Sequence, residues 1–199
     1  MAAQLKTVQR AQKDQGNCAK CKNPLPAGGP YRYYRPGFRS RAKVTLCMKP
    51  ECTPRRSQLE SSRMSTAYES IESAQDSIPA LTRIEEIEEA IQQCANEIRD
   101  VADEYESSIS ETPMLEATLR DRVDELEQFA DDLESLELDE EPGAPESPSA
   151  NPADYGADFT AELTEAIEAH EKAYLEWESA RDQAVEDAKE TALDALANL

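Results

Sequence analysis

The sequence predicts a mainly α protein in which a small N-terminal finger with a β-hairpin precedes long helices. Four of the five cysteines lie between residues 18 and 52, apolar residues recur at intervals of three and four from residue 59 onward, and prolines separate the helical parts. We therefore expect a basic arm or short helix over 1–15, a four-cysteine finger over 16–56, a helical region over 57–138, a proline-rich flexible linker over 139–157 and an acidic, alanine-rich helix over 158–199.

The charge is distributed unevenly along the chain. Residues 1–63 hold 14 Lys and Arg against 3 Asp and Glu, a net +11, whereas residues 64–199 hold 7 against 39, a net −32. A basic head suggests an anion-binding surface, and an acidic body repels nucleic acid or attracts basic partners. No stretch is apolar enough to predict a membrane span.

The cysteines form two short pairs, Cys18-x₂-Cys21 and Cys47-x₄-Cys52. Two such hooks are typical of a tetrahedral zinc site, with two disulfides or a redox pair as the alternatives. Because Met1–Lys6 carries no apolar signal segment, we expect the chain to stay in a reducing cytosol, where disulfides rarely persist. Four protein ligands leave no open position, so the expected Zn²⁺ is structural, one per chain.

A strand, turn and second strand are predicted over Tyr31–Arg35, Pro36-Gly37 and Phe38–Leu46. Basic residues alternate there with aromatic ones, a combination typical of phosphate contact and base stacking. The candidate nucleic-acid-binding residues are Arg32, Arg35, Arg39, Arg41, Lys43, Tyr33 and Tyr34, although some of the aromatic residues must also form the core of the finger.

A knuckle, a hairpin and then a helix near the second cysteine pair is the order of a treble-clef or zinc-ribbon-like finger. The last ligand is followed by Thr53 and then by Pro54-Arg-Arg-Ser-Gln-Leu59. Over about residues 18–77 this arrangement resembles largely uncharacterised zinc-finger proteins of tailed bacteriophages. The resemblance implies a phage-encoded zinc protein in the cytoplasm of an infected bacterium, and it implies no activity.

The rest of the chain is predicted to be helical. Thr53-Pro54 is expected to open a first helix, and the heptad from Ile84 to Tyr105 and the stripe from Leu115 to Leu136 should pair as an antiparallel hairpin over 79–138. Thr112 is expected to cap the second arm. The C-terminal helix should carry its stronger apolar face in its first half, from Phe159 to Trp177, and a weaker one from Val185 to Leu199.

Three residues with distinctive side-chain chemistry are predicted to be packing residues. Cys94 occupies a heptad position, while His170 and Trp177 lie in the apolar stripe of the last helix. With one histidine, a saturated metal site, no phosphate-binding glycine loop and no nucleophile elbow, the sequence predicts that the protein is not an enzyme.

Two functions remain open. In the first, the finger contacts nucleic acid and the acidic helices recruit host or phage proteins, with oligomerisation through the helices as a further option. In the second, the protein is an adaptor or inhibitor whose acidic body binds a basic host protein, with mimicry of nucleic acid as an option, while the zinc is purely structural. The finger and hairpin also distantly resemble RNA polymerase secondary-channel regulators, but those place the finger after the hairpin. An acidic capsid scaffold is a third class, which would not need zinc.

Overall fold

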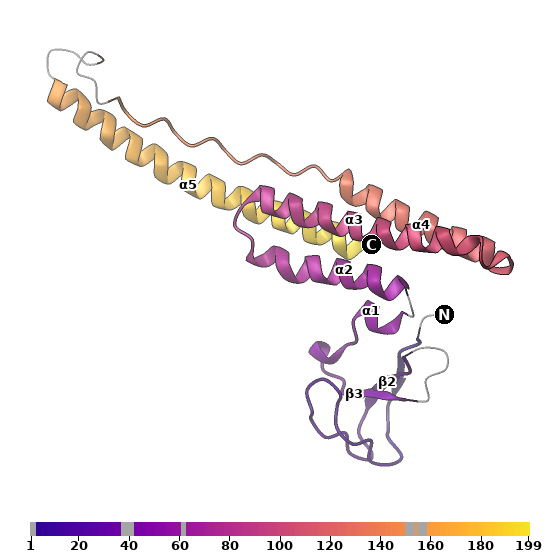
Figure 1. Cartoon of the computed structure of the whole chain (residues 1–199). Helices are drawn as coiled ribbons and strands as arrows, with labels where there is room; N and C mark the ends of the chain where they lie inside the picture. Colours follow the sequence, from indigo (N-terminus) through magenta and orange to yellow (C-terminus); the bar gives the residue numbers. More distant parts are fainter. Residues whose placement is uncertain (1–2, 37–41, 61–62, 150–153, 155–158) are drawn as a thin grey trace. The chain divides into compact units, whose positions relative to one another are not determined.

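The computed structural model of the chain describes residues 3–36, 42–60, 63–149, 154 and 159–199. It divides into two compact units: Met1–Asp76 with Gln93–Asp131, and Ser77–Gln92 with Asp132–Leu199. In the part of the chain that the structure describes, helices dominate and one small sheet lies in the N-terminal finger, which confirms the mainly α prediction (Figure 1). Among the described residues, no helix combines the length and hydropathy needed to span a membrane.

The sheet of the finger is antiparallel, in the order β1 (Lys6–Val8), β2 (Tyr31–Tyr34) and β3 (Val44–Leu46). Strands β2 and β3 form the predicted hairpin, with Tyr33 opposite Thr45. The second strand was expected from residue 38, but residues 37–41 lie outside the described residues.

The prediction of a basic arm or short helix over 1–15 did not include a strand, but Lys6–Val8 pairs with β2 and places Lys6 opposite Tyr33. The strand is only three residues long and exposes both Lys6 and Thr7, so its sequence shows little of the alternation between buried and exposed residues that predicts a strand. Pairing with β2, which lies far away in the sequence, is what makes this segment a strand.

The core of the finger is small. Its buried members are Ala11, Leu25, Tyr31, Tyr34 and Leu46, together with Cys18 and Cys52. Only two of these are large aliphatic side chains, so apolar burial alone gives this segment little stability. A further stabilising element is therefore expected among the cysteines.

The helix after the second cysteine pair begins later than predicted. A 3₁₀ turn, η1, covers Pro50–Cys52, and Thr53 is extended at φ −64° and ψ 133°. Helix α1 then spans Arg56–Leu59 and helix α2 spans Arg63–Ser77. The expected start at Thr53-Pro54 is wrong, because Pro54 is buried in a segment that is not helical. The Gln58 side chain accepts the Arg55 backbone N–H at 3.1 Å, and this cap fixes the helix start at Arg56.

Helices α3 (Ile84–Ile109) and α4 (Glu116–Glu134) bury most of the predicted stripes. The prediction is wrong for Leu115, which lies in the 3₁₀ turn η3 (Pro113–Leu115) before α4 and is 52% exposed. In the first unit Arg99 pairs with Asp131 at 2.7 Å, and in the second Gln92 donates to Glu134 at 3.1 Å, as an antiparallel pair requires. Thr112 does not cap the second arm, since its hydroxyl donates to the Ser108 carbonyl. The buried stripe residues are Ile84, Ile87, Ile91, Cys94, Ile98, Val101, Val123, Leu126, Ala130 and Leu133.

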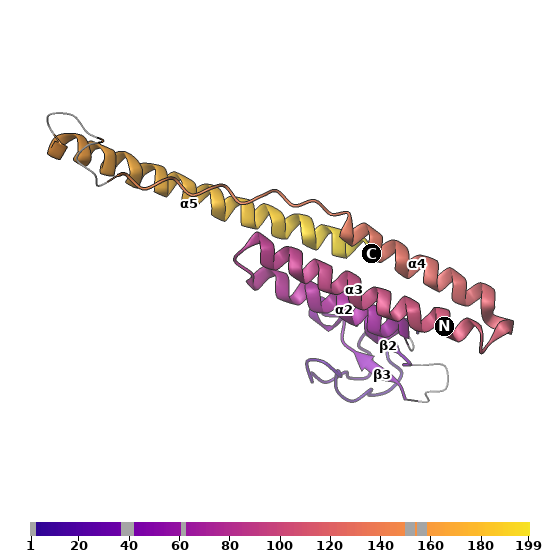
Figure 2. The ribbon, with the colours of Figure 1, turned by 45° about the horizontal axis from the view of Figure 1, so that its top comes forward.

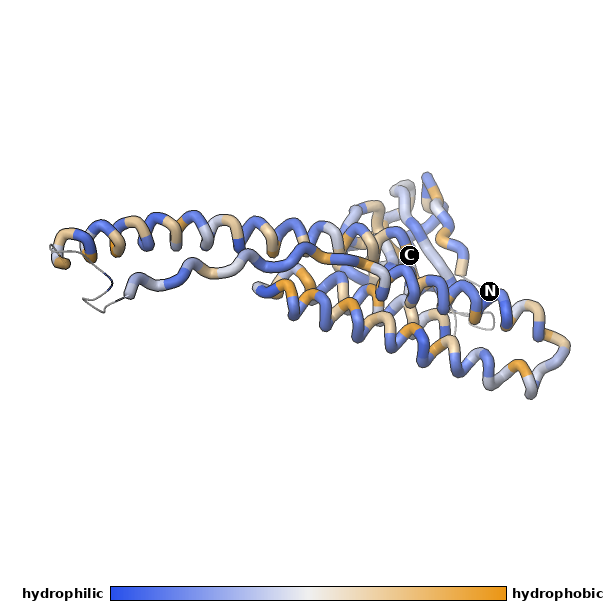
Figure 3. Tube along the Cα trace, turned by 90° about the horizontal axis from the view of Figure 1, so that it is seen from above, coloured by the Kyte–Doolittle hydropathy of each residue, from blue (hydrophilic) through white to orange (hydrophobic). Residues whose placement is uncertain are grey.

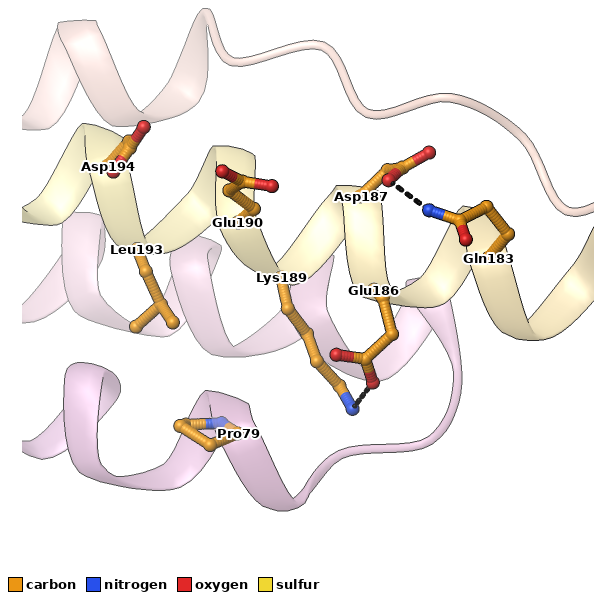
Figure 4. Close-up of a pocket in the computed structure, with 8 residues that line it drawn as sticks. All are labelled: Pro79, Gln183, Glu186, Asp187, Lys189, Glu190, Leu193 and Asp194. Atoms are coloured by element: carbon orange, nitrogen blue, oxygen red, sulfur yellow. Dashed lines mark hydrogen bonds and ion pairs between the residues drawn. The ribbon is translucent and has the colours of Figure 1, made fainter.

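Helix α5 (Phe159–Asn198) packs on η2 (Ile78–Ala80) through its C-terminal half. Figure 4 shows Pro79 of η2 facing Leu193, with Lys189 and Glu186 paired at 2.8 Å beside it. Apolar residues recur once per turn along the helix (Figure 3). The expectation that the first half of the helix has the stronger buried face is wrong: the buried residues are Val185, Ala188, Ala192 and Leu196, which lie in the half that meets η2.

Candidate metal centre

The four predicted cysteines meet at one point in the finger. Their sulfur atoms all lie within 4.8 Å of one another, and those of Cys21 and Cys47 are 3.6 Å apart. Cys18 and Cys52 are buried and the other two are half-buried. A tetrahedron with metal–sulfur bonds of about 2.3 Å has sulfur–sulfur distances of about 3.8 Å, so the cluster fits one tetrahedral ion.

The first hook is a tight turn between Cys18 and Lys22. The Lys22 N–H donates to the Cys18 carbonyl at 3.0 Å and the Cys18 N–H to the Asn23 carbonyl at 2.8 Å. Lys22 adopts a left-handed φ of 62°, a conformation that costs about 1 kcal/mol for a residue with a side chain. The Ala19 N–H donates to the Thr45 carbonyl at 2.9 Å and attaches the turn to β3.

The second hook is braced by Arg32 from β2. Its guanidinium donates to the carbonyl oxygens of Cys47 (3.3 Å) and Lys49 (2.8 Å) and to the Thr53 hydroxyl (3.0 Å). The Lys20 ammonium donates to the Thr53 carbonyl at 2.6 Å and so links the two hooks. The sulfur positions are therefore fixed by polar contacts outside the cluster, as in preorganised metal sites.

The environment of the sulfurs favours at least one thiolate. Burial raises the pKa of Cys18, but hydrogen bonds from the backbone N–H groups of Cys47, Cys21 and Lys20 outweigh it and bring the pKa to about 6. Burial, together with the neighbouring thiols, raises the pKa of Cys52 to about 12. A bound cation would neutralise this concentration of sulfur and hold all four as thiolates.

Cys94 has a different environment, since it is buried on α3 and is not part of the cluster. Burial raises its pKa to about 12, with a smaller contribution from the charge of Glu97. It is a neutral packing residue, in agreement with its heptad position.

The predicted nucleic-acid-binding residues that the structure describes have different environments. Arg32 is engaged with the second hook, and Tyr34 is buried in the core, where burial raises its pKa. Lys43 lies 4.3 Å from the ring centre of half-buried Tyr33. Arg35 is exposed, while Arg39 and Arg41 lie outside the described residues.

The Pro54–Leu59 segment forms a joint that was not predicted from the sequence. The Ser57 hydroxyl donates to Glu72 at 2.6 Å, the Arg55 guanidinium donates twice to Asp76 at 2.7 and 3.0 Å, and the Arg56 guanidinium lies 4.3 Å from the Tyr68 ring centre. These contacts connect the segment after the last cysteine to α2. The sequence signal that could have predicted this joint was the presence of acidic residues in α2, on the side that meets the Arg-Arg-Ser run.

No protein-family model, curated protein or solved structure matches this chain. The resemblance to phage zinc-finger proteins therefore stays a prediction.

Proposed function

We propose that this protein is a non-enzymatic adaptor in which a structural zinc stabilises the finger and its joint to α2, while the acidic helices bind a basic protein surface. Support for zinc comes from the donor set: four thiolates on two short hooks match its softness and tetrahedral preference. Four protein ligands leave no position for a substrate, so the ion would supply folding energy and no chemistry.

The observation that carries the adaptor proposal is that three arginines of the finger make contacts within the chain. Arg32 bonds the second hook, Arg55 pairs with Asp76, and Arg56 stacks on Tyr68. Guanidinium groups held in this way are poorly placed for phosphate contacts. The acidic residues on the outer faces of α3 and α4 are, by contrast, exposed: Glu88, Glu89, Asp100, Asp103, Asp121, Asp124, Glu127 and Asp132.

The test is capture of basic proteins on the immobilised full-length chain from a nuclease-treated bacterial lysate. A variant with Asp121→Asn, Asp124→Asn and Glu127→Gln should lose the captured protein, because complementary charge drives encounter and register. The matched control neutralises Glu165, Glu168 and Glu171, three exposed residues of α5, and should retain it. Two results would contradict the adaptor proposal. One is a protein that is captured from untreated lysate but not from nuclease-treated lysate, and the other is a protein that the first variant still captures.

A second candidate, nucleic-acid contact, is favoured by one surface of the sheet. The Lys43 ammonium lies 4.5 Å and 4.3 Å from the ring centres of Tyr31 and Tyr33, and exposed Lys6 is opposite Tyr33 in the register. Labelled single- and double-stranded DNA should then bind in low salt and be released as salt rises. Replacing Lys6, Lys43, Arg39 and Arg41 by alanine should lower both the affinity and the salt slope, whereas undetectable binding in low salt would remove this candidate.

A further inference from the structure

The N-terminal half of α5 carries an aromatic stripe on one face, composed of His170, Tyr174 and Trp177. The ring centres of Tyr174 and Trp177 are 5.1 Å apart and those of His170 and Tyr174 are 6.2 Å apart. Phe159, Leu163 and Ile167 extend the stripe toward the start of the helix at intervals of three and four residues. Tyr174 and Ile167 are each 43% exposed, so the helical contacts of the second unit leave this face incompletely buried.

The segment before α5 has prolines at every third position, Pro142, Pro145 and Pro148. It forms neither helix nor strand over 136–149, and a polyproline II helix has three residues per turn, which would align the three prolines along one edge. The three prolines are all half-buried, so the edge that they form is the less exposed side of the segment. The residues between them are exposed: Gly143, Ala144, Glu146 and Ser147.

A direct contact joins this edge to the stripe. The Trp177 indole N–H donates to the Pro142 carbonyl at 2.7 Å. From there the segment runs along α5 toward its N-terminus, as the differing views of Figures 1 and 2 both show. The start of the segment is also fixed, because the Glu141 carboxylate accepts the Ile84 N–H at 3.1 Å. The expected linker is thus attached over its described first part.

The spacing of the prolines along the segment matches the spacing of the stripe residues along α5. Three polyproline residues advance about 9 Å, equal to about six residues of an α-helix. Starting from Pro142 at Trp177 and running in the opposite direction to α5, Pro145 falls near His170 and Tyr174, and Pro148 falls between Leu163 and Ile167. With these ideal spacings, each proline would lie level with a large side chain of the stripe.

We propose that the aromatic stripe of α5 is a recognition surface for polyproline II ligands and that it is occupied in cis by the Pro142–Pro148 segment, here called the strap. Proline rings contact the aromatic faces, and the Trp177 N–H supplies the polar contact to a backbone carbonyl. This chemistry suits an already extended, proline-rich chain, which loses little conformational entropy on docking. A partner peptide with the same spacing would compete with the strap. The inference is independent of the proposed adaptor function.

Trp177 is the only tryptophan, so its fluorescence in the full-length chain tests the strap directly. Pro145→Ser with Pro148→Ser should shift the emission to longer wavelength and increase acrylamide quenching, because the ring loses its cover. The matched control changes the exposed positions between the prolines, Ala144→Ser with Ser147→Ala, and should behave as the parent chain. Far-ultraviolet circular dichroism should be unchanged in both variants, since no helix is altered. Emission and quenching unchanged in the proline variant would overturn the proposal.

The second measurement asks whether the surface recognises the ligand class. A synthetic peptide with the sequence of Asp139–Ser149 is titrated into the proline variant, and the tryptophan emission should return toward shorter wavelength in a saturable way. A peptide of the same composition with its prolines placed consecutively should have no such effect. An equal response to both peptides, or none to either, would contradict polyproline II recognition.

Discussion

The Arg32 guanidinium donates to two carbonyl groups and one hydroxyl of the loop that carries Cys47 and Cys52. Arg32→Ala removes these donors without removing a ligand, so the loop should sample more conformations and bind the metal less tightly. We expect a loss of metal affinity of about 10- to 100-fold, typical of residues that orient ligands. Competition with a chromophoric chelator measures it, and Arg35→Ala, at an exposed neighbouring position, should leave the affinity unchanged. Equal affinities for the two variants would contradict the bracing role.

Cys94 gives a prediction about reactivity. Burial raises its pKa to about 12, above the value near 8.5 of an exposed thiol. In the metal-loaded chain at pH 8 the thiol should stay protonated and be alkylated by iodoacetamide much more slowly than in urea. Because the pKa is raised in the folded state, Cys94 favours folding at neutral pH, and that contribution declines as the pH rises from about 8.5 toward 12. Rapid native alkylation, located by peptide mass spectrometry, would contradict the buried assignment.

At the scale of elements, the joint between α1 and α2 depends on Ser57 more than on Arg55. The buried Ser57 donates through its hydroxyl and its N–H to the two carboxylate oxygens of Glu72. Ser57→Ala should lower the free energy of unfolding by about 1–3 kcal/mol, since a carboxylate loses a donor in a partly buried site. Asp76→Ala breaks only the exposed pair with Arg55 and should have little effect. Urea unfolding followed by circular dichroism compares the two variants, and the reverse order of stability would contradict this description of the joint.

The stripe of α3 supplies a second element-scale prediction. Ile98 is fully buried, so Ile98→Ala should cost about 2–5 kcal/mol of unfolding free energy. Met114 between α3 and α4 is 97% exposed, and Met114→Ala should be neutral within error. Urea denaturation at saturating metal distinguishes them. A cost below 1 kcal/mol at Ile98 would show that α3 does not bury this face.

The features predicted correctly were those encoded in local spacing. Cysteine pairs two and four residues apart, and isoleucines three and four apart, act through their own turn or helix face, so Cys18 and Ile98 were assigned from sequence alone. Strand β1 and the start of α1 depend on partners far along the chain, such as Tyr33 for Lys6. The role of Arg32 was also hidden, because nothing local distinguishes an arginine that bonds a ligand loop from one that faces solvent. The half of α5 that is buried was predicted wrongly because η2, not aromatic content, selects it.

At the scale of the whole molecule, the chain combines a finger that has a minimal apolar core with an acidic helical body. The finger holds its four sulfurs within 4.8 Å and has few large aliphatic side chains of its own. A structural zinc contributes on the order of 10 kcal/mol to such a domain. Removing the metal should therefore unfold the finger while the apolar stripes of α3 and α4 preserve most of the helical signal.

The central claim is that Cys18, Cys21, Cys47 and Cys52 together hold one structural zinc ion, and elemental analysis of the purified full-length chain tests it most directly. We predict one zinc per chain in the parent protein and in Cys94→Ala, whose cysteine lies outside the cluster, and a large loss of zinc in Cys47→Ser. A full complement of zinc in Cys47→Ser, or loss of zinc in Cys94→Ala, would contradict the account.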